Sequence, residues 1–511
     1  MWRGLICAGS VLWLAAAAAG QTFTNTAGPM QQARAYATAT LLQDGTVLVA
    51  GGAEGDNVLA SAEIYDPASS TFRGTGSMSR PRAAAQAQLL PDGKVLIMGG
   101  EASDGFFHNN TAPLSTDIYD PAKGTFAAGP SLSFALNAVL SARLADGRIF
   151  LTGVAGGADC GDQHTCTGPV EIYNPAQGQF TADGALQVPR TVATATALDD
   201  GEVLTYGGWS ANAAGATSAT QTYEIFNPAT GTSTLLTSST VPVFGQAAVK
   251  LDDGRVLICG GNSHGIGAVK ACEIFDPQTQ QVAYTTGAML AGRNQVAATL
   301  LSDHRVLVAG GNNQPPDAEL FAPELQTFSA AGNFNTERAY FTATLLDDGS
   351  VLIAGGDAPG DGSALASAEV FTAGAATADF SLAADNTIAT DSTAASVSFK
   401  ITAAGANGFS GSIALSCAGT GAALCALAPG SVHPGETSTL TVSGLDLSQS
   451  GVLDFQVVGT SGTLSHTLAL RIAIEPPLPQ LAPATLSFGD ETVGQTSATQ
   501  KVTLSNSGEG T

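Results

Sequence analysis

The sequence predicts an all-β protein in which a seven-bladed β-propeller is followed by a β-sandwich and by the start of a second, truncated sandwich. The main observation is the segment Asp44–Gly52, which returns six times at intervals of 45 to 54 residues. A period of this length is typical of propellers and solenoids. The second observation is that four strand-like segments accompany each copy. The later copies begin at Asp92, Asp146, Asp200, Asp253, Asp303 and Asp348.

The sequence of each repeat predicts four strands in a fixed order. An Ala/Thr-rich strand such as Thr38–Leu42 comes first, and its small side chains suit the crowded centre of a propeller. An Asp-Gly turn leads into an apolar second strand that ends in Gly-Gly, where backbone can pass close to backbone. The third strand ends in Asp-Pro, as in Glu63–Pro67, and a fourth strand such as Thr71-Phe72 follows. Two copies depart from the pattern, with His304 for the turn glycine and Val154 for one glycine of the pair.

The two ends of the repeat region predict how the ring closes. Residues 22–30 resemble a fourth strand without a blade, whereas the last repeat has no fourth strand after Glu369-Val-Phe371. Pairing these segments would complete blade seven and leave no exposed sheet edge. The propeller is therefore expected to span residues 21–378.

The chain after residue 378 predicts different modules. Residues 379–475 contain alternating strand-like segments separated by turns, which is typical of a β-sandwich. Residues 476–483 form a proline-rich linker, and residues 484–511 resemble the first strands of another sandwich. Two strands do not form a stable sandwich alone, so the chain is expected to be a fragment or a truncated reading frame.

The repeated apolar run, Gly-Gly and aromatic-Asp-Pro strand resemble the kelch repeat. One departure is that Phe72, Phe126, Phe180 and Phe328 stand where many kelch repeats have a fourth-strand Trp. The resemblance implies a propeller like the central domain of galactose oxidase, and binding of partners near the mouth of the central channel. Residues 379–475, including Cys417 to Pro429, resemble the immunoglobulin-like modules of exported bacterial proteins.

Charge and the N-terminal segment predict the compartment and exclude some partners. The 511-residue chain has a net charge of −24, which argues against binding to nucleic acid and to anionic membranes. Residues 1–20 resemble a signal peptide, with Arg3 before an apolar run that is short for a membrane span. A secreted or cell-surface protein with a monomeric propeller and no later membrane span is expected, and a retained N-terminal anchor is the alternative.

The cysteines predict disulfides. Six remain after removal of Cys7 with the signal peptide, and an even number in an exported chain favours disulfides. None of the spacings matches a zinc site. The expected pairs are Cys160/Cys166, Cys259/Cys272 and Cys417/Cys425.

Arginines recur ten residues before the turn aspartate in five of the seven repeats. They open the first strand and so should lie on the face of the variable loops between strands two and three. A ring of arginines could bind an anionic group of a ligand. The alternative is that each arginine pairs with the acid of the third strand, because structural positions repeat and ligand contacts seldom do. The candidates are Arg34, Arg82, Arg190, Arg293 and Arg338.

Other candidate ligand groups are isolated. Trp209 follows a Gly-Gly pair and is a candidate for stacking on a sugar ring, with packing beneath its loop as the alternative. His108, His164 and His264 fall in variable loops without a second ligand at suitable spacing. The segment Asp357–Gly362 lacks the bidentate Glu of a calcium loop. No metal and no cofactor is therefore expected.

The sequence as a whole favours a non-enzymatic role, namely binding or adhesion to an unknown protein or carbohydrate through the variable-loop face. The galactose-oxidase resemblance implies an enzymatic alternative, which would require two His and two Tyr at copper and one Tyr linked to a Cys. No such set, and no hydrolase triad or carboxylate pair tied to a motif, is evident in the sequence. The alternatives are a carbohydrate-active enzyme, oxidase-like or lyase-like, and a structural spacer.

Overall fold

The structure, a computed structural model, forms two compact units, Met1–Ala375 and Ala376–Thr511. It describes residues 20–100, 113–155, 167–211, 217–220, 222–237, 243–263, 266–311, 317–360, 362–374, 378–385, 388–390, 396–419, 422–445, 451–474, 479–482, 501 and 503–506. Within these ranges the regular secondary structure consists of β-strands and one short 3₁₀ turn, as an all-β prediction requires.

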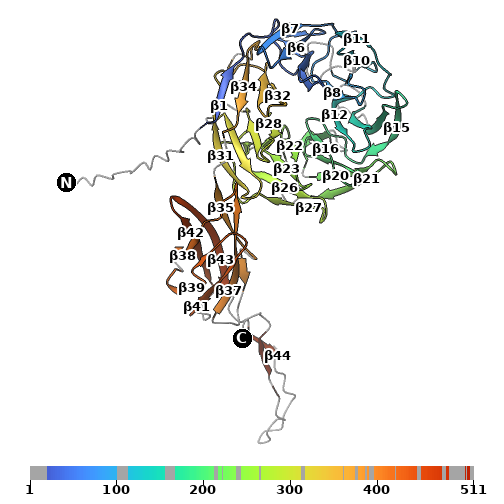
Figure 1. The fold of residues 1–511 in the computed structure, drawn as a ribbon. Helices are drawn as coiled ribbons and strands as arrows, with labels where there is room; N and C mark the ends of the chain where they lie inside the picture. The colour runs from blue at the N-terminus through green and yellow to red at the C-terminus, as the bar shows by residue number, and fades with distance from the viewer. Residues whose placement is uncertain are drawn as a thin grey trace, which may run out of the picture. The chain divides into compact units, whose positions relative to one another are not determined.

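The first unit is built from four-stranded antiparallel sheets arranged around a ring (Figure 1). Blade one contains β2 (Thr38–Leu41), β3 (Val47–Ala50), β6 (Ala62–Asp66) and β7 (Thr71–Gly74). Blade two contains β8 (Gln86–Leu89), β9 (Val95–Met98), β10 (Asp117–Asp120) and β11 (Thr125–Ala128). Blade three contains β12 (Asn137–Arg143), β13 (Ile149–Val154), β14 (Gly168–Asn174) and β15 (Gln179–Leu186). Blade four contains β16 (Thr194–Ala197), β17 (Val203–Tyr206), β20 (Thr222–Asn227) and β21 (Thr232–Thr237).

The remaining blades follow the same order, and the N-terminal strand completes the last one. Blade five contains β22 (Ala247–Lys250), β23 (Val256–Cys259), β26 (Cys272–Asp276) and β27 (Gln281–Tyr284). Blade six contains β28 (Ala297–Leu300), β29 (Val306–Ala309), β30 (Ala318–Ala322) and β31 (Thr327–Gly332). Blade seven contains β32 (Thr342–Leu345), β33 (Val351–Ala354), β34 (Ala368–Thr372) and β1 (Thr22–Asn25), which pairs antiparallel with β34.

The first strands of the blades surround the centre of the ring. Each contacts the first strand of the next blade, and β32 of blade seven contacts β2 of blade one. Their Ala and Thr side chains are only partly buried, whereas the apolar second strands are buried throughout. The hydrophobic clusters lie between successive blades, as Leu48 and Ile64 of blade one pack with Ile97 of blade two. Burial between blades thus holds the ring together.

Backbone hydrogen bonds join neighbouring blades near the centre of the ring. The residue two positions after the repeat arginine has positive φ, which non-glycine residues adopt mainly where other contacts enforce it. Its N–H donates to the carbonyl of the corresponding residue in the preceding blade, as Tyr36 does to Tyr340 and Ala84 to Tyr36 at 3.0 and 2.9 Å. The residues with this φ are Tyr36, Ala84, Val192, Gly245, Gln295 and Tyr340.

The Gly-Gly pairs lie where two blades approach each other. The N–H of Gly52 donates to the carbonyl of Arg82 in the next blade at 2.8 Å. A Cβ on Gly51 would lie 2.3 Å from that same carbonyl oxygen. Glycine is required here because backbone meets backbone at a distance that no side chain tolerates.

Short hairpins extend three of the loops between strands two and three. They are β4 (Ala53–Glu54) with β5 (Asn57–Val58), β18 (Trp209–Ala211) with β19 (Thr217–Ala219), and β24 (Asn262–Ser263) with β25 (Gly267–Ala268). We call the side of the ring that carries these loops the loop face, and the side that carries the Asp-Gly turns the turn face. Antiparallel pairing places them at opposite ends of the strands.

The second unit contains a β-sandwich. One sheet contains β35 (Asp379–Ala384), β37 (Ser396–Ala406), β41 (Thr437–Ser443) and β39 (Cys425–Ala428). The other contains β36 (Ile388–Thr390), β43 (Leu464–Ile474), β42 (Gly451–Ser461), β38 (Ile413–Gly419) and β40 (Ser431–Val432). Alternate side chains such as Phe399, Ile401 and Phe455 form one buried core between the sheets. A short 3₁₀ turn, Ala422–Leu424, precedes β39, and β44 (Pro479–Ala482) pairs with β45 (Thr503–Asn506).

Two of the predicted disulfides are present. Cys259 and Cys272 join β23 to β26, and Cys417 is bonded to Cys425 in the sandwich. Cys160 and Cys166 lie outside the described residues. Among the described residues, no helix is long and apolar enough to span a membrane.

Candidate functional site at the mouth of the channel

The repeat arginines lie inside the blades and pair with the third-strand acids. The side chains of Arg293 and Glu319 are both 0% exposed, with Nη2 and Oε1 2.8 Å apart. Each arginine also donates to the carbonyl of the first glycine of its Gly-Gly pair, seventeen residues later; Arg293 donates to Gly310 at 2.9 Å. Burial lowers the pKa of Arg82, Arg190 and Arg338, and the paired carboxylates oppose this effect. The other four pairs are Arg34–Glu63, Arg82–Asp117, Arg190–Glu224 and Arg338–Glu369.

The third-strand acids also hold the segment that enters each blade. Glu319 accepts hydrogen bonds from the backbone N–H groups of Leu290 and Ala291, just before Arg293. The acid and the arginine together fasten this segment to the third strand. The guanidinium groups of Arg34, Arg82, Arg190, Arg293 and Arg338 are thus enclosed by their own blades. The prediction that they bind an anionic ligand is corrected, and the alternative of structural ion pairs describes them.

Blades three and five lack the arginine but keep the acid. Leu136 stands at the arginine position of blade three, and Glu171 is 0% exposed and accepts bonds from the N–H groups of Ser133 and Phe134. In blade five Val243 stands there, and the hydroxyl of Tyr206 from blade four donates to Glu273. The acid is therefore the constant part of the motif.

Two tyrosines meet at the junction of blades seven and one on the loop face. The rings of Tyr36 and Tyr340 are stacked, with centroids 4.3 Å apart and an interplanar angle of 29°. Each follows the repeat arginine in an Arg-Ala-Tyr sequence, and ring closure makes the first and last repeats neighbours. Neither tyrosine is a candidate from the sequence, although the repeated Arg-Ala-Tyr is a signal that could have revealed them.

The tyrosine pair lies close to a carboxyl group. Asp357 follows the Gly-Gly pair of blade seven, and its backbone pairs with that of Ala339, next to Tyr340. Burial raises the pKa of Asp357 above its usual value. Burial also raises the pKa of Tyr36, and Tyr340 and Asp357 raise it further. The phenol of Tyr36 therefore keeps its proton at neutral pH, and its hydroxyl group is hydrogen-bonded to Tyr340.

A second aromatic pair lies on the same face between blades four and five. Trp209 pairs through its backbone with Thr191, at the start of blade four. Its indole contacts the ring of Phe244, with centroids 4.5 Å apart, and both side chains are partly exposed. Trp209 thus packs on a neighbouring ring while part of it stays accessible, and its role in ligand binding remains a prediction.

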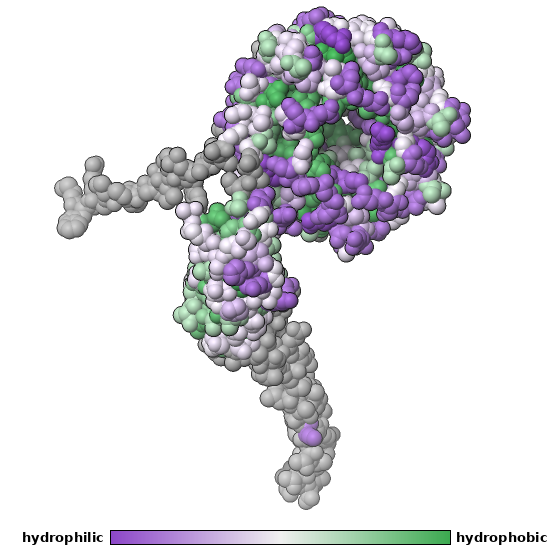
Figure 2. Space-filling model, in the orientation of Figure 1, coloured by the Kyte–Doolittle hydropathy of each residue, from purple (hydrophilic) through white to green (hydrophobic). Residues whose placement is uncertain are grey.

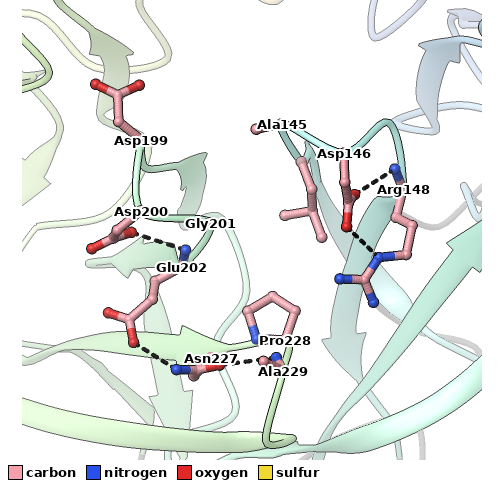
Figure 3. A pocket seen from close by; sticks show the side chains of 11 residues that line it. Ala145, Asp146, Arg148, Asp199, Asp200, Gly201, Glu202, Asn227, Pro228 and Ala229 are labelled. Carbon is pink, nitrogen blue, oxygen red and sulfur yellow. Dashed lines mark hydrogen bonds and ion pairs between the residues drawn. The ribbon is translucent and has the colours of Figure 1, made fainter.

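The turn face carries a cavity of about 340 Å³ between blades three and four (Figure 3). Its acidic side chains are engaged within the protein: Asp146 accepts from Arg148, Asp200 from the backbone of Glu202, Glu202 from Asn227, and Asp199 from Lys250 of blade five. The same aspartate-to-backbone bond recurs in other Asp-Gly turns, for example at Asp44 and Asp253. These carboxylates stabilise turns and provide no argument for a ligand.

The described residues contain no group of three or more His, Cys, Asp or Glu side chains that could hold a metal ion. His108, His164 and His264 lie outside the described residues. His304 lies on the turn face beside Asp252, and Cys259 is in a disulfide. Of the groups that a galactose-oxidase-like copper centre requires, the described part of the channel mouth supplies only a pair of tyrosines. These residues do not fit a copper site.

No protein-family model matches the sequence, and no curated protein matches it either. The structure is similar to that of a fungal alcohol oxidase of the AA5 family, solved in complex with copper. The similarity has a TM-score of 0.53 at 14% sequence identity and covers 87% of this chain and 98% of the oxidase. At this identity the similarity shows a shared fold.

The similarity corrects the function expected from the sequence. The expectation was a non-enzymatic binding or adhesion protein, with a galactose-oxidase-like enzyme as the alternative. A protein that shares this fold over most of the chain is an alcohol oxidase, which does not agree with the first expectation. The first expectation, together with the expectation that the chain is not an enzyme, is therefore withdrawn.

Proposed function

We propose that this chain is a carbohydrate-active enzyme of the galactose-oxidase-like type, acting on a hydroxyl group of a sugar or a related alcohol. The observation that carries the proposal is the stacked pair of Tyr36 and Tyr340 at the channel mouth, in a fold shared with an alcohol oxidase. Such a mouth is a usual place for a ligand, since rigid blades fix the ends of the surrounding loops.

The groups at the mouth suit a hydroxylated substrate. The hydrogen-bonded phenol groups of Tyr36 and Tyr340 can both donate and accept, whereas the carboxylate of Asp357 accepts when it is ionised. A sugar hydroxyl both donates and accepts, so these two groups can orient it. Because the described residues do not fit a copper site, the role assigned to them is confined to binding and orienting this hydroxyl group.

We also propose that the protein is secreted or displayed at the cell surface. The disulfides Cys259–Cys272 and Cys417–Cys425 are typical of an oxidising compartment. The signal-like segment of residues 1–20 supports the same proposal.

The test is a turnover assay on the full secreted chain with a panel of sugars and primary alcohols, with and without added Cu(II). Turnover of at least one sugar or alcohol is expected, and hydrogen peroxide formed in step with oxygen consumption would identify the reaction as oxidation by O₂. The variants Tyr36→Phe and Tyr340→Phe should lower the rate, whereas Tyr284→Phe, on an outer strand, should leave it unchanged. The absence of any turnover across the panel would refute the enzymatic proposal.

A further inference from the structure

The two aromatic pairs of the loop face lie on opposite sides of the ring. Tyr36 and Tyr340 belong to blades one and seven, and Trp209 and Phe244 to the junction of blades four and five. The first strands follow one another in order around the ring, so blades two and three lie between the pairs in one direction and blade six in the other. Figure 1 shows β32 and β16, the first strands of blades seven and four, on opposite sides of the central opening.

Each pair offers accessible aromatic surface over the same opening. All four side chains are partly buried rather than enclosed. The space-filling view shows a hollow at the centre of the ring, with hydrophilic residues gathered around its rim and hydrophobic residues between and behind them (Figure 2). Aromatic rings offer a flat apolar face that packs against the flat C–H face of a sugar, and pockets for small ligands are commonly lined in this way.

Charge at the mouth favours a neutral ligand. The five repeat arginines are neutralised inside the blades, so they add no net positive charge to the opening. The described loops of this face carry four carboxyl groups, those of Glu54, Asp56, Glu337 and Asp357, against the two cations Arg80 and Lys270. An acidic sugar would be repelled by this excess of carboxylates.

We propose that the loop face binds a neutral oligosaccharide that extends across the channel mouth, with one sugar on the Tyr36–Tyr340 pair and another on the Trp209–Phe244 pair. This inference deepens the proposed function and rests on it for the reacting group. It adds that the substrate is a chain of several sugars rather than a single sugar. The sugar that reacts lies on the tyrosine pair, beside Asp357.

The distinguishing measurement is how affinity depends on chain length. Neutral gluco-, manno- and galacto-oligosaccharides of increasing length are titrated calorimetrically into the full chain, with oligogalacturonates as the acidic comparison. Affinity should rise with length until one chain reaches both aromatic pairs and should then stay constant. Equal affinity for single sugars and long chains, or preferred binding of the acidic chains, would overturn the inference.

Substitutions then locate the two ends of the ligand. Trp209→Ala and Tyr340→Ala should each weaken binding of a long neutral chain by about five- to tenfold, the usual effect of one aromatic contact. Alanine suits position 340 because Ala84 occupies the corresponding position of blade two with positive φ. Tyr284→Ala is the matched control, since Tyr284 is an exposed aromatic residue of the outer strand β27. Unchanged affinity in both mouth variants, with folding verified by thermal unfolding, would overturn the inference.

The assays separate failure of the inference from failure of the proposed function. Length-dependent binding without any turnover would remove the enzymatic proposal and leave the oligosaccharide site standing. Turnover of single sugars at a rate that chain length and Trp209→Ala do not change would support the enzyme and overturn the extended site.

Discussion

Blades five and six hold the same pair of strands together by different means. In blade six Arg293 is enclosed between the Gly-Gly end of β29 and Glu319 on β30. Blade five has Val243 at the arginine position, and a disulfide joins Cys259 at the end of β23 to Cys272 at the start of β26. Strands two and three are thus joined by a covalent bond in blade five and by an ion pair in blade six.

This difference shows that the third-strand acid and the group that joins strands two and three have separate roles. The acid is present in every blade, because the backbone N–H groups that enter the blade need a buried acceptor. The group that joins strands two and three differs between blades, being an ion pair in blade six and a disulfide in blade five. Blade three also lacks the arginine, and it contains the other two propeller cysteines, Cys160 and Cys166, which lie outside the described residues.

The largest effect is expected when blade six is made to resemble blade three, by Arg293→Leu. Glu319 then remains buried without its cation, which typically costs about 3–5 kcal/mol of the free energy of unfolding. Urea unfolding of the propeller measures the change. A loss below about 1 kcal/mol would mean that backbone N–H groups alone suffice for the acid, as they do for Glu171.

A somewhat smaller loss is expected when the disulfide of blade five is removed by Cys259→Ala together with Cys272→Ala. The bond closes a loop of thirteen residues, for which chain entropy predicts about 3 kcal/mol. Adding Val243→Arg to this variant should recover part of the loss by pairing with Glu273. If Val243→Arg destabilises the protein further, an ion pair cannot replace the disulfide in blade five. Removal of the sandwich disulfide Cys417–Cys425 is the control for general effects of cysteine loss.

Glutamine substitutions compare the acids directly. Glu171→Gln removes a buried charge that has no cation partner among the described residues and keeps an acceptor for the entering N–H groups, so a change within about 1 kcal/mol is expected. Glu319→Gln leaves Arg293 without its counterion and should cost several times more. Equal losses in the two variants, measured by thermal unfolding, would contradict the division of roles.

The repeat pattern made the blades predictable from sequence. Asp-Gly turns, apolar second strands and Gly-Gly pairs are local signals, and their sevenfold return removes the ambiguity of any single copy. The pairing of Cys259 with Cys272 followed from the same alignment of repeats. The role of the arginines could not be predicted in this way. The same spacing is compatible with a ring of ligand-binding arginines at the channel mouth and with an ion pair inside each blade, and only burial of the side chains distinguishes the two.

The candidate site was less predictable because it arises from ring closure. Tyr36 and Tyr340 are some 300 residues apart in sequence and become neighbours when blades seven and one meet. Trp209 was selected as an isolated aromatic residue, but its contact with Phe244 depends on how blade four meets blade five. Local sequence patterns say little about the contacts between blades at the channel mouth, so only the folded structure reveals them.

The smallest effect is expected from a substitution at the residue after the Gly-Gly pair. Blade seven has Asp357 at this position, and blade five has Asn262. The variant Asp357→Asn makes the two blades alike. Burial raises the pKa of Asp357 in the folded protein, so across the range just above its usual value of 3.8 the folded state binds more protons than the unfolded state. The stability contributed by Asp357 therefore falls as the pH rises through that range.

Asp357→Asn should thus become more stable relative to the unsubstituted protein as the pH rises from below 3.8 to about 7, by less than any change above. Urea unfolding at several pH values measures this difference. A difference that does not vary with pH would show that the carboxyl group is as well solvated in the folded chain as in the unfolded one. In that case the carboxyl group of Asp357 would face open water rather than be partly enclosed beside Tyr36.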